Sequence, residues 1–371
     1  MEVKHKLIDT TLREGEQTPG IVFSTEQKFR IIELLAMVGV YEIELGISTS
    51  LATCLPHLTR FCRSRYPRMR LSLWSRCREE DIRHAASLLP DILSLSIPVS
   101  DIHLSNRLDK NRSWAKSTLR SSICSARDAG MRVSVGFEDA TRADRQFLKE
   151  MVLVAKNQGA ERIRLADTVG VGSPKSIMAL FTEVGSMAEC DLGIHAHNDF
   201  GMASANSIAA LEAGASWADT TVLGLGERTG CARLEELAGY LALVMNCRSM
   251  HAEYLKPLAK YVSTATGRTI AGNRPLIGDD IFTCETGLHL QGLQNDPKTY
   301  EPYAPERVGA QRTLLFGAKS GRKAILQKMK TLGLSSSDQT MNRSLISSLR
   351  SKARHLGRPF SDEELLAQWE G

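Results

Sequence analysis

The sequence lacks the long apolar runs, closely spaced cysteine pairs and low-complexity linkers that mark several protein classes. No stretch approaches the ~20 consecutive apolar residues of a transmembrane helix, so we expect no membrane span. A strand-like segment begins almost at once, so we expect no signal peptide. None of the eight cysteines forms a CxxC pair, and a 371-residue chain needs no disulfide scaffold. We therefore expect reduced thiols and a cytoplasmic protein.

A strong excess of charge of one sign is also missing. The formal net charge is +5 and is spread along the chain, so we expect no nucleic acid partner. The basic cluster near the C-terminus is expected to be a solvated face, and its members are Arg343, Arg350, Lys352, Arg354 and His355. An apolar fraction of 42% is enough for a large hydrophobic core. These features predict a globular protein that acts on small molecules.

Short apolar strands alternate with helix-like segments over the first ~250 residues, and eight such βα units predict a closed (β/α)8 TIM barrel. The expected strands are Lys6–Thr11, Glu42–Leu45, Arg70–Trp74, Ile92–Ile97, Arg132–Phe137, Arg162–Ala166, Leu192–His197 and Asp219–Leu223. The clearest helical segments are Ser24–Val38, Asp144–Gln158, Pro174–Met187 and Ala203–Ala213. An open doubly wound sheet is the alternative. It is disfavoured because no strand is followed by a convincing GxGxxG turn.

Beyond residue 250 this alternation ends, which divides the chain into a barrel domain (residues 1–250) and a helical C-terminal extension (residues 251–371). Helical segments of the extension are expected at His251–Gly267, Ser320–Leu332, Asn342–His355 and Asp362–Gln368. An irregular stretch from Ile270 to Arg312 lies between the first two of them.

Polar side chains cluster where the expected strands end. The carboxyl ends of barrel strands form one rim, and active sites of this fold lie there. The rim residues are Thr11, Arg13, Glu14, Glu44, Ser75, Arg76, Ser100, Glu138, Asp139, Asp167, Thr168, His195, His197 and Asn198. So many polar groups on one rim predict an active site.

Two of these residues, His195 and His197, are spaced i, i+2 on a strand and therefore face the same side. Both imidazoles can then bind one metal ion, with a carboxylate from another segment as the third ligand. Such a donor set suits zinc, manganese or magnesium in different degrees. We therefore predict one divalent metal ion.

Two long motifs carry a family resemblance. Asp9-Thr-Thr-Leu-Arg-Glu-Gly-Glu-Gln17 opens the chain, and His195-Ala-His-Asn-Asp199 is followed by Gly224-Leu-Gly-Glu-Arg-Thr-Gly230. Together they resemble the signatures of the metal-dependent Claisen-condensing barrel enzymes. These are the isopropylmalate, citramalate and homocitrate synthases, with hydroxymethylglutaryl-CoA lyases as more distant relatives. Three further stretches are similar to the homocitrate synthases of nitrogen-fixing bacteria: Leu95–Asp101, Glu138–Asp144 and Asp219–Glu227.

The resemblance implies a reaction between acetyl-CoA and a 2-oxo acid. Acetyl-CoA loses a methyl proton, the enolate attacks the ketone, and thioester hydrolysis releases CoA. With 2-oxoglutarate the product is homocitrate, which is used in the nitrogenase cofactor. The resemblance also implies a homodimer, in which the C-terminal extension caps the active site of the partner subunit. The catalytic base then matches His289, and imidazole suits proton transfer near neutral pH.

The resemblance further implies roles for residues at the rim. Glu14, His195 and His197 match the metal ligands. Arg13, next to the metal, would stabilise the oxyanion that develops on the ketone, and a rim salt bridge is the alternative. Glu138 is expected to relay a proton or to position the acetyl group.

Five more rim residues are candidates for substrate contacts: Gln17, Glu44, Arg76, Ser100 and Thr168. Arg76 would pair with the far carboxylate of a dicarboxylic oxo acid, with a structural ion pair as the alternative. The Gly224–Gly230 loop, through Glu227 and Arg228, would contact the CoA phosphates, unless it is a plain tight turn.

The sequence departs from the family pattern at three places. Cys231 replaces an asparagine that is common near the metal, and Cys284 replaces the first histidine of Thr-His-x-x-Gly-x-His. Gly317-Ala-Lys-Ser-Gly321 stands where the family has Gly-Lys-His-Ser-Gly. These changes are compatible with a shifted substrate, an altered metal preference or a weakened paralogue. Because thiolate prefers zinc over magnesium, we expect Cys231 to favour softer ions.

Several functions stay open at this point. One or two rim residues decide which oxo acid is used, so a Re-type citrate synthase, a citramalate synthase and an isopropylmalate synthase remain alternatives. A lyase running the reverse reaction is disfavoured, because lyases lack the extension that bears His289. A non-catalytic paralogue is disfavoured by the retained candidate residues, which are Arg13, Glu14, His195, His197 and His289.

Overall fold

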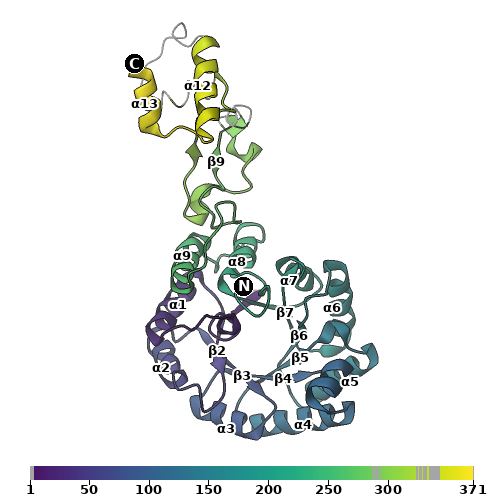
Figure 1. Cartoon of the computed structure of the whole chain (residues 1–371). Coiled ribbons are helices and arrows are strands. Elements are labelled where there is room, and N and C mark those ends of the chain that lie inside the picture. The colour runs from purple at the N-terminus through teal and green to yellow at the C-terminus, as the bar shows by residue number, and fades with distance from the viewer. Residues whose placement is uncertain are drawn as a thin grey trace. The chain divides into compact units, whose positions relative to one another are not determined.

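A closed barrel of eight parallel strands forms the larger part of the computed structural model (Figure 1). Its strands are β1 (Lys6–Asp9), β2 (Glu42–Ile47), β3 (Arg70–Arg76), β4 (Ile92–Pro98), β5 (Val133–Glu138), β6 (Arg162–Asp167), β7 (Asp191–Ala196) and β8 (Trp217–Thr220). They follow one another in chain order, and β8 pairs with β1 to close the barrel. The predicted TIM barrel is therefore confirmed, and the open doubly wound alternative is wrong.

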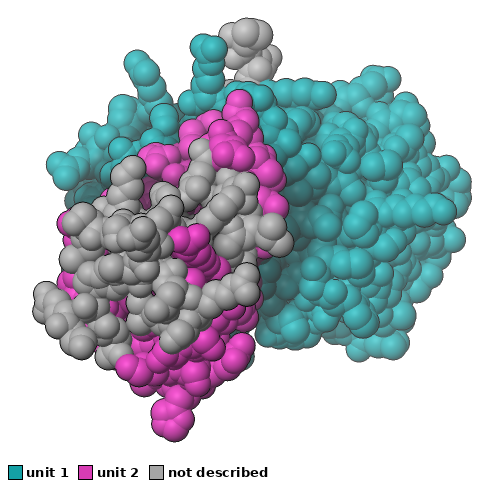
Figure 2. All heavy atoms as spheres, turned by 90° about the horizontal axis from the view of Figure 1, so that it is seen from above, with its two compact units in different colours: residues 1–269 teal, residues 270–371 magenta. Residues whose placement is uncertain are grey.

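The structure describes residues 4–285, 289, 292–293, 295–322, 325, 328, 332–333 and 343–370. The chain forms two compact units, Met1–Thr269 and Ile270–Gly371, which are coloured separately in Figure 2. None of the helices in these described residues is long and apolar enough to cross a membrane.

The helices of the first unit lie outside the barrel (Figure 1). They are α1 (Thr25–Val38), α2 (Leu55–Arg65), α3 (Glu79–Leu88), α4 (Arg112–Asp128), α5 (Arg145–Asn157), α6 (Pro174–Ala188), α7 (Ala203–Glu212), α8 (Leu234–Leu243) and α9 (Leu255–Thr266). Four of them begin after a residue whose side chain accepts a hydrogen bond from the first-turn backbone: Ser24, Asn111, Asp144 and Ser173. Such caps satisfy backbone N–H groups that have no partner within the helix.

The first unit extends beyond the boundary expected near residue 250. It includes α9, which packs against α1 and α8. The second unit contains the strands β9 (Thr283–Cys284) and β10 (Thr313–Leu314) and the helices α12 (Arg343–Leu356) and α13 (Asp362–Glu370). It has its own apolar core, formed by Phe316, Ile325, Ile346, Leu349, Ala353, Phe360 and Leu365. The helix expected at Ser320–Leu332 lies partly outside the described residues.

The barrel interior is charged rather than filled with apolar layers. Glu42 on β2 accepts two hydrogen bonds from Arg162 on β6, at 2.7 and 3.1 Å, and both side chains are almost fully buried. A Cβ added to Gly136 would lie 3.6 Å from Nε of Arg164, and one on Gly193 would lie 3.9 Å from Cδ of Arg162. The two arginine side chains therefore pass within van der Waals distance of glycine positions inside the barrel.

One buried carboxyl group at the start of α8 predicts how stability depends on pH. Glu235 accepts a hydrogen bond from the backbone N–H of Leu223 at 2.7 Å, and its other oxygen, Oε2, has no partner. Burial raises the pKa of Glu235 to about 7. The ordinary pKa in the unfolded chain is about 4.3, so the folded protein binds this proton more tightly. Stability is therefore highest below the unfolded value and falls as pH rises toward 7.

We expect Glu235→Gln to unfold at the same temperature as the wild type at pH 4, but at a higher temperature at pH 8. The neutral amide keeps the acceptor for Leu223 and removes a cost that reaches roughly 3 kcal/mol once the wild-type group is ionised. Thermal unfolding at several pH values measures this difference. Equal pH dependence in the two proteins would contradict the prediction.

Candidate active site

A tight turn after β1 brings two charged side chains into the barrel mouth. The carbonyl of Thr10 accepts hydrogen bonds from the backbone N–H groups of Arg13, Glu14 and Gly15, at 3.0, 2.7 and 3.2 Å. These three bonds to one carbonyl make a tight turn, so the side chains of Arg13 and Glu14 lie next to each other. The guanidinium group of Arg13 pairs with the carboxylate of Glu14, and both side chains are buried.

The other half of the site comes from β7 and from the loop after β8. His195 lies on β7 and His197 follows it, so the pleat directs both rings to the same side. The segment after β8 pairs with this strand end, because N–H of Asn198 donates to O of Gly230 at 2.8 Å and N–H of Ala232 to O of Ala196 at 3.1 Å. This pairing places Cys231 opposite His197.

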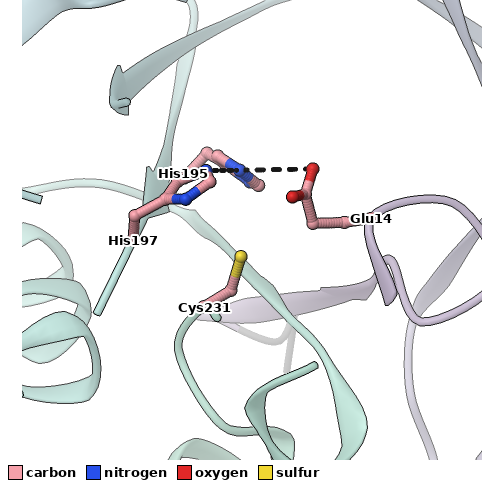
Figure 3. A group of neighbouring side chains, drawn as sticks. All are labelled: Glu14, His195, His197 and Cys231. Atoms are coloured by element: carbon pink, nitrogen blue, oxygen red, sulfur yellow. Dashed lines mark hydrogen bonds and ion pairs between the residues drawn. The ribbon is translucent and has the colours of Figure 1, made fainter. Parts of the chain in front are cut away.

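The two halves meet in a cluster of four donor groups, Glu14, His195, His197 and Cys231 (Figure 3). One ligand atom from each residue lies within 4.8 Å of all the others, and all four side chains are buried. The two Nε2 atoms are 3.2 Å apart, and Nε2 of His195 lies 3.9 Å from Oε2 of Glu14. The structure therefore brings together the three residues that sequence analysis selected as metal ligands, and adds a sulfur.

A carboxylate behind the cluster orients one imidazole. Nδ1 of His195 lies 2.9 Å from Oδ2 of Asp219 on β8. When Nδ1–H donates to this oxygen, Nε2 keeps its lone pair directed toward the other donors. Arg164 donates to the same oxygen of Asp219 at 2.7 Å and to Glu44 at 3.1 Å. Burial alone would raise the pKa of Asp219, but Arg164 and His195 outweigh it and hold the pKa below its ordinary value.

The charges in the mouth favour a cation. Arg13 and Arg164 form ion pairs with three carboxylates, those of Glu14, Glu44 and Asp219, which leaves one excess negative charge in this connected network. Burial raises the pKa of Glu14, but Arg13 and the two histidines together lower it by more. The net pKa lies below the ordinary value, so the carboxylate is ionised at neutral pH.

Two further donors, His197 and Cys231, are uncharged at neutral pH. Burial, and then the neighbouring His195, lower the pKa of His197 to about 3, so its ring is an uncharged imidazole. Burial raises the pKa of the Cys231 thiol well above its ordinary value. Neutral imidazoles and an ionised carboxylate are the forms that bind metals. The residues present therefore fit a divalent ion.

A cavity of about 240 Å³ opens beside this cluster. Its lining includes seven of the residues expected at the site: Arg13, Glu14, Gln17, Glu138, Thr168, His195 and His197. The remaining lining residues are Trp74, Ser96, Arg107, Gly136, Arg164, Ala166 and Glu227. Residues from most of the barrel strands thus share one cavity at the carboxyl ends of the strands.

Three expected substrate contacts do not line this cavity. Glu44 is fully buried beneath Arg13, to which it is bonded. Arg76 makes two hydrogen bonds to Asp81, at 2.7 and 3.0 Å, which is the structural ion pair that sequence analysis left open. The hydroxyl of Ser100 accepts from the N–H of His103 at 3.3 Å and supports the turn after β4. A position at the carboxyl end of a strand therefore does not by itself predict that a side chain lines the cavity.

Sequence analysis missed two cationic lining residues, Arg164 on β6 and Arg107. Arg107 is the one whose guanidinium group is not bonded to the carboxylates around the donor cluster. It ends a π-helical turn, His103–Arg107, between β4 and α4. Its guanidinium group pairs with the carboxylate of Glu138, which also accepts from the hydroxyl of Ser96 at 2.8 Å. Because Arg107 lies several residues beyond its strand, the strand-end pattern gave no signal for it.

Two predicted roles stay predictions. In the Gly224–Gly230 loop, Arg228 donates to Asp199 at 2.8 and 2.9 Å and to the carbonyl of Thr168 at 2.8 Å, and its Nη2 lies 3.0 Å from Nδ1 of His197. Its donors therefore already have partners within the protein. His289 belongs to the second unit, where its ring is exposed and lies 4.4 Å from the ring of Tyr300. Contact of the loop with CoA phosphates and the base role of His289 are not tested by these contacts.

Comparison with known proteins covers almost the whole chain. Residues 4–256 match the HMGL-like family model, and residues 276–364 match a model described as homocitrate synthase post-HMGL domain-like. A homocitrate synthase of Frankia alni is 39% identical over 88% of this chain and 93% of its own length. A 2-isopropylmalate synthase of Caldanaerobacter subterraneus is 34% identical over 98% of this chain and 94% of its own. The crystal structure of a hydroxymethylglutaryl-CoA lyase from Pseudomonas aeruginosa shares the fold, with a TM-score of 0.65 at 19% identity over 72% of this chain and 95% of that one.

Proposed function

The chain belongs to the HMGL-like family, and we propose that it condenses acetyl-CoA with 2-oxoglutarate to give homocitrate and CoA. An acyltransferase-type activity agrees with its homocitrate synthase and isopropylmalate synthase relatives. The observation that carries the choice of a dicarboxylic oxo acid is the cavity itself. It joins three donors of the cluster and the guanidinium group of Arg13 to a further guanidinium group, that of Arg107.

Each end of the oxo acid then has a partner of suitable chemistry. A divalent ion held by Glu14, His195 and His197 supplies Lewis-acid polarisation of the ketone. Arg13 donates to the oxygen on which negative charge develops. Burial lowers the pKa of Arg13, but the neighbouring carboxylates of Glu44 and Glu14 raise it by a larger amount. The guanidinium group is therefore charged at every pH at which the protein is folded.

The far carboxylate pairs with Arg107 in this proposal. A guanidinium group offers a planar fork of donors that matches a carboxylate, and Arg107 is half exposed and therefore accessible from solvent. We propose that Glu138, its present partner, relays a proton or positions the acetyl group. We further propose that His289 acts as the base from the partner subunit of a homodimer.

The proposal is tested by incubating the protein with acetyl-CoA, a divalent metal and one 2-oxo acid at a time. The panel contains 2-oxoglutarate, oxaloacetate, pyruvate and 2-oxoisovalerate, and mass spectrometry identifies each product. We expect homocitrate to form with the highest kcat/KM. A higher kcat/KM with another acid would contradict the choice of 2-oxoglutarate, and no product with any acid would contradict the condensation itself.

Two arginine variants test whether the far carboxylate of the oxo acid contacts Arg107, which lines the cavity, or Arg76, which was expected from its place at a strand end. We expect Arg107→Met to raise KM for 2-oxoglutarate roughly 10- to 100-fold, because a charge-assisted hydrogen bond contributes about 1.5–3 kcal/mol. The matched variant Arg76→Met removes a guanidinium group that is bonded to Asp81 outside the cavity, so KM should stay close to the wild-type value. The opposite ranking of the two KM values would assign the carboxylate contact to Arg76.

A further inference from the structure

We propose that Cys231 binds the metal ion as a thiolate, so that the site selects zinc, cobalt or iron over magnesium. The sulfur is a free thiol that belongs to the buried cluster with Glu14, His195 and His197, and Figure 3 shows it directed toward their donor atoms. The inference deepens the proposed function, because the same ion serves the condensation. It concerns the ion's identity and ligand set, which can be measured without substrates.

The backbone holds the sulfur in this position from two sides. The antiparallel bridge between His197 and Cys231 places the cysteine one strand spacing from a histidine donor. On the other side, a Cβ added to Gly226 would lie 3.0 Å from Sγ of Cys231 and 3.4 Å from Oε1 of Glu14. Glycine at position 226 therefore lets the loop pass close to both donors. A side chain there would crowd the sulfur.

The mixture of donor types sets the expected selectivity. Magnesium prefers oxygen ligands and keeps much of its water shell, whereas this cluster offers only one carboxylate. Thiolate and imidazole suit zinc, cobalt and iron, and thiolate adds a soft ligand that magnesium does not use. On coordination the thiol proton passes to solvent and the sulfur lone pair forms the bond, with no change in oxidation state.

The alternative arrangement keeps Cys231 as a protonated neighbour of an ion held by Glu14, His195 and His197 alone. Both arrangements bury the sulfur equally, so burial does not separate them. They differ in whether a sulfur–metal bond exists, which gives an optical signal when the ion is cobalt(II).

The test uses the full chain, stripped of metal by a chelator and reloaded with cobalt(II) in the absence of acetyl-CoA and oxo acid. We expect the wild type to show a near-ultraviolet thiolate-to-cobalt charge-transfer band, and Cys231→Ser and Cys231→Asn to bind cobalt without that band. The matched variant Cys62→Ala removes another buried thiol, far from the donors in sequence and absent from the cluster, and should keep the band. Wild-type protein that binds cobalt without the band would overturn the proposal.

Zinc affinity, measured by chelator competition on the same four proteins, is the second readout. We expect it to fall at least about 10-fold in both Cys231 variants and to be unchanged in Cys62→Ala, while magnesium affinity does not fall in any of them. Equal zinc affinity in the wild type and both Cys231 variants would also overturn the proposal. If the band is present but no oxo acid gives product, the condensation fails and the thiolate ligand stands. If product forms without the band, only the ligand assignment fails.

Discussion

Arg13→Lys is expected to lower kcat roughly 100- to 1000-fold, which is the usual cost of removing one donor to a developing oxyanion. Lysine keeps the positive charge between Glu14 and Glu44 but loses the planar fork of donors. The remaining ammonium group cannot hold both carboxylates and also reach the ketone oxygen. Because this interaction strengthens as charge develops, the loss should fall mainly on kcat rather than on KM.

Three measurements separate this role from a structural one. Metal content and thermal unfolding should stay close to wild type, since the charge between the two carboxylates is retained. Steady-state kinetics at saturating acetyl-CoA and oxo acid then report the chemical step. A folded, metal-loaded Arg13→Lys protein with nearly wild-type kcat would show that Arg13 is only the rim salt bridge that sequence analysis kept as its alternative.

The barrel was predictable because its signal is a period repeated eight times. Each strand is short and apolar, each is followed by a helix, and the total length matches the fold, so errors of a few residues at strand ends do not change the result. The largest such error concerns β8, which was expected to end at Leu223 and in fact ends at Thr220. The charged interior was not predictable, because nothing local indicates that Arg162 and Arg164 point inward toward Glu42 and Glu44.

The donor cluster was predictable only in part. The spacing of His195 and His197 places two imidazoles on one face of a strand, and the motif resemblance added Glu14. Other residues of the site gave no such signal: Arg107 comes from a turn beyond a strand, and Asp219, on the neighbouring strand, was noticed only within a motif. Their roles depend on which side chains the closed barrel places face to face, and strand-end position also failed for Arg76.

Asp219→Asn tests the carboxylate that orients His195. In the wild type Oδ2 of Asp219 accepts from both His195, at 2.9 Å, and Arg164, at 2.7 Å. In the variant we expect the amide oxygen to keep both contacts and the NH₂ group to take the place of Oδ1, which has no hydrogen-bond partner among the described residues. The amide oxygen carries no full negative charge, so it holds Nδ1–H of His195 less strongly and makes Nε2 a weaker donor to the metal.

We expect this change to weaken metal binding roughly 10- to 100-fold, the usual cost of mutating such an outer-sphere partner. Chelator competition measures the affinity. A recovery of kcat at saturating metal would separate the positioning role of Asp219 from a direct role in the reaction. Glu42→Gln is the matched control, because Glu42 is also a buried barrel carboxylate and is bonded to Arg162 rather than to a donor of the cluster. Glu42→Gln should lower thermal stability and leave metal affinity unchanged. An equal loss of affinity in both variants would mean that barrel stability, and not the orientation of His195, sets metal binding.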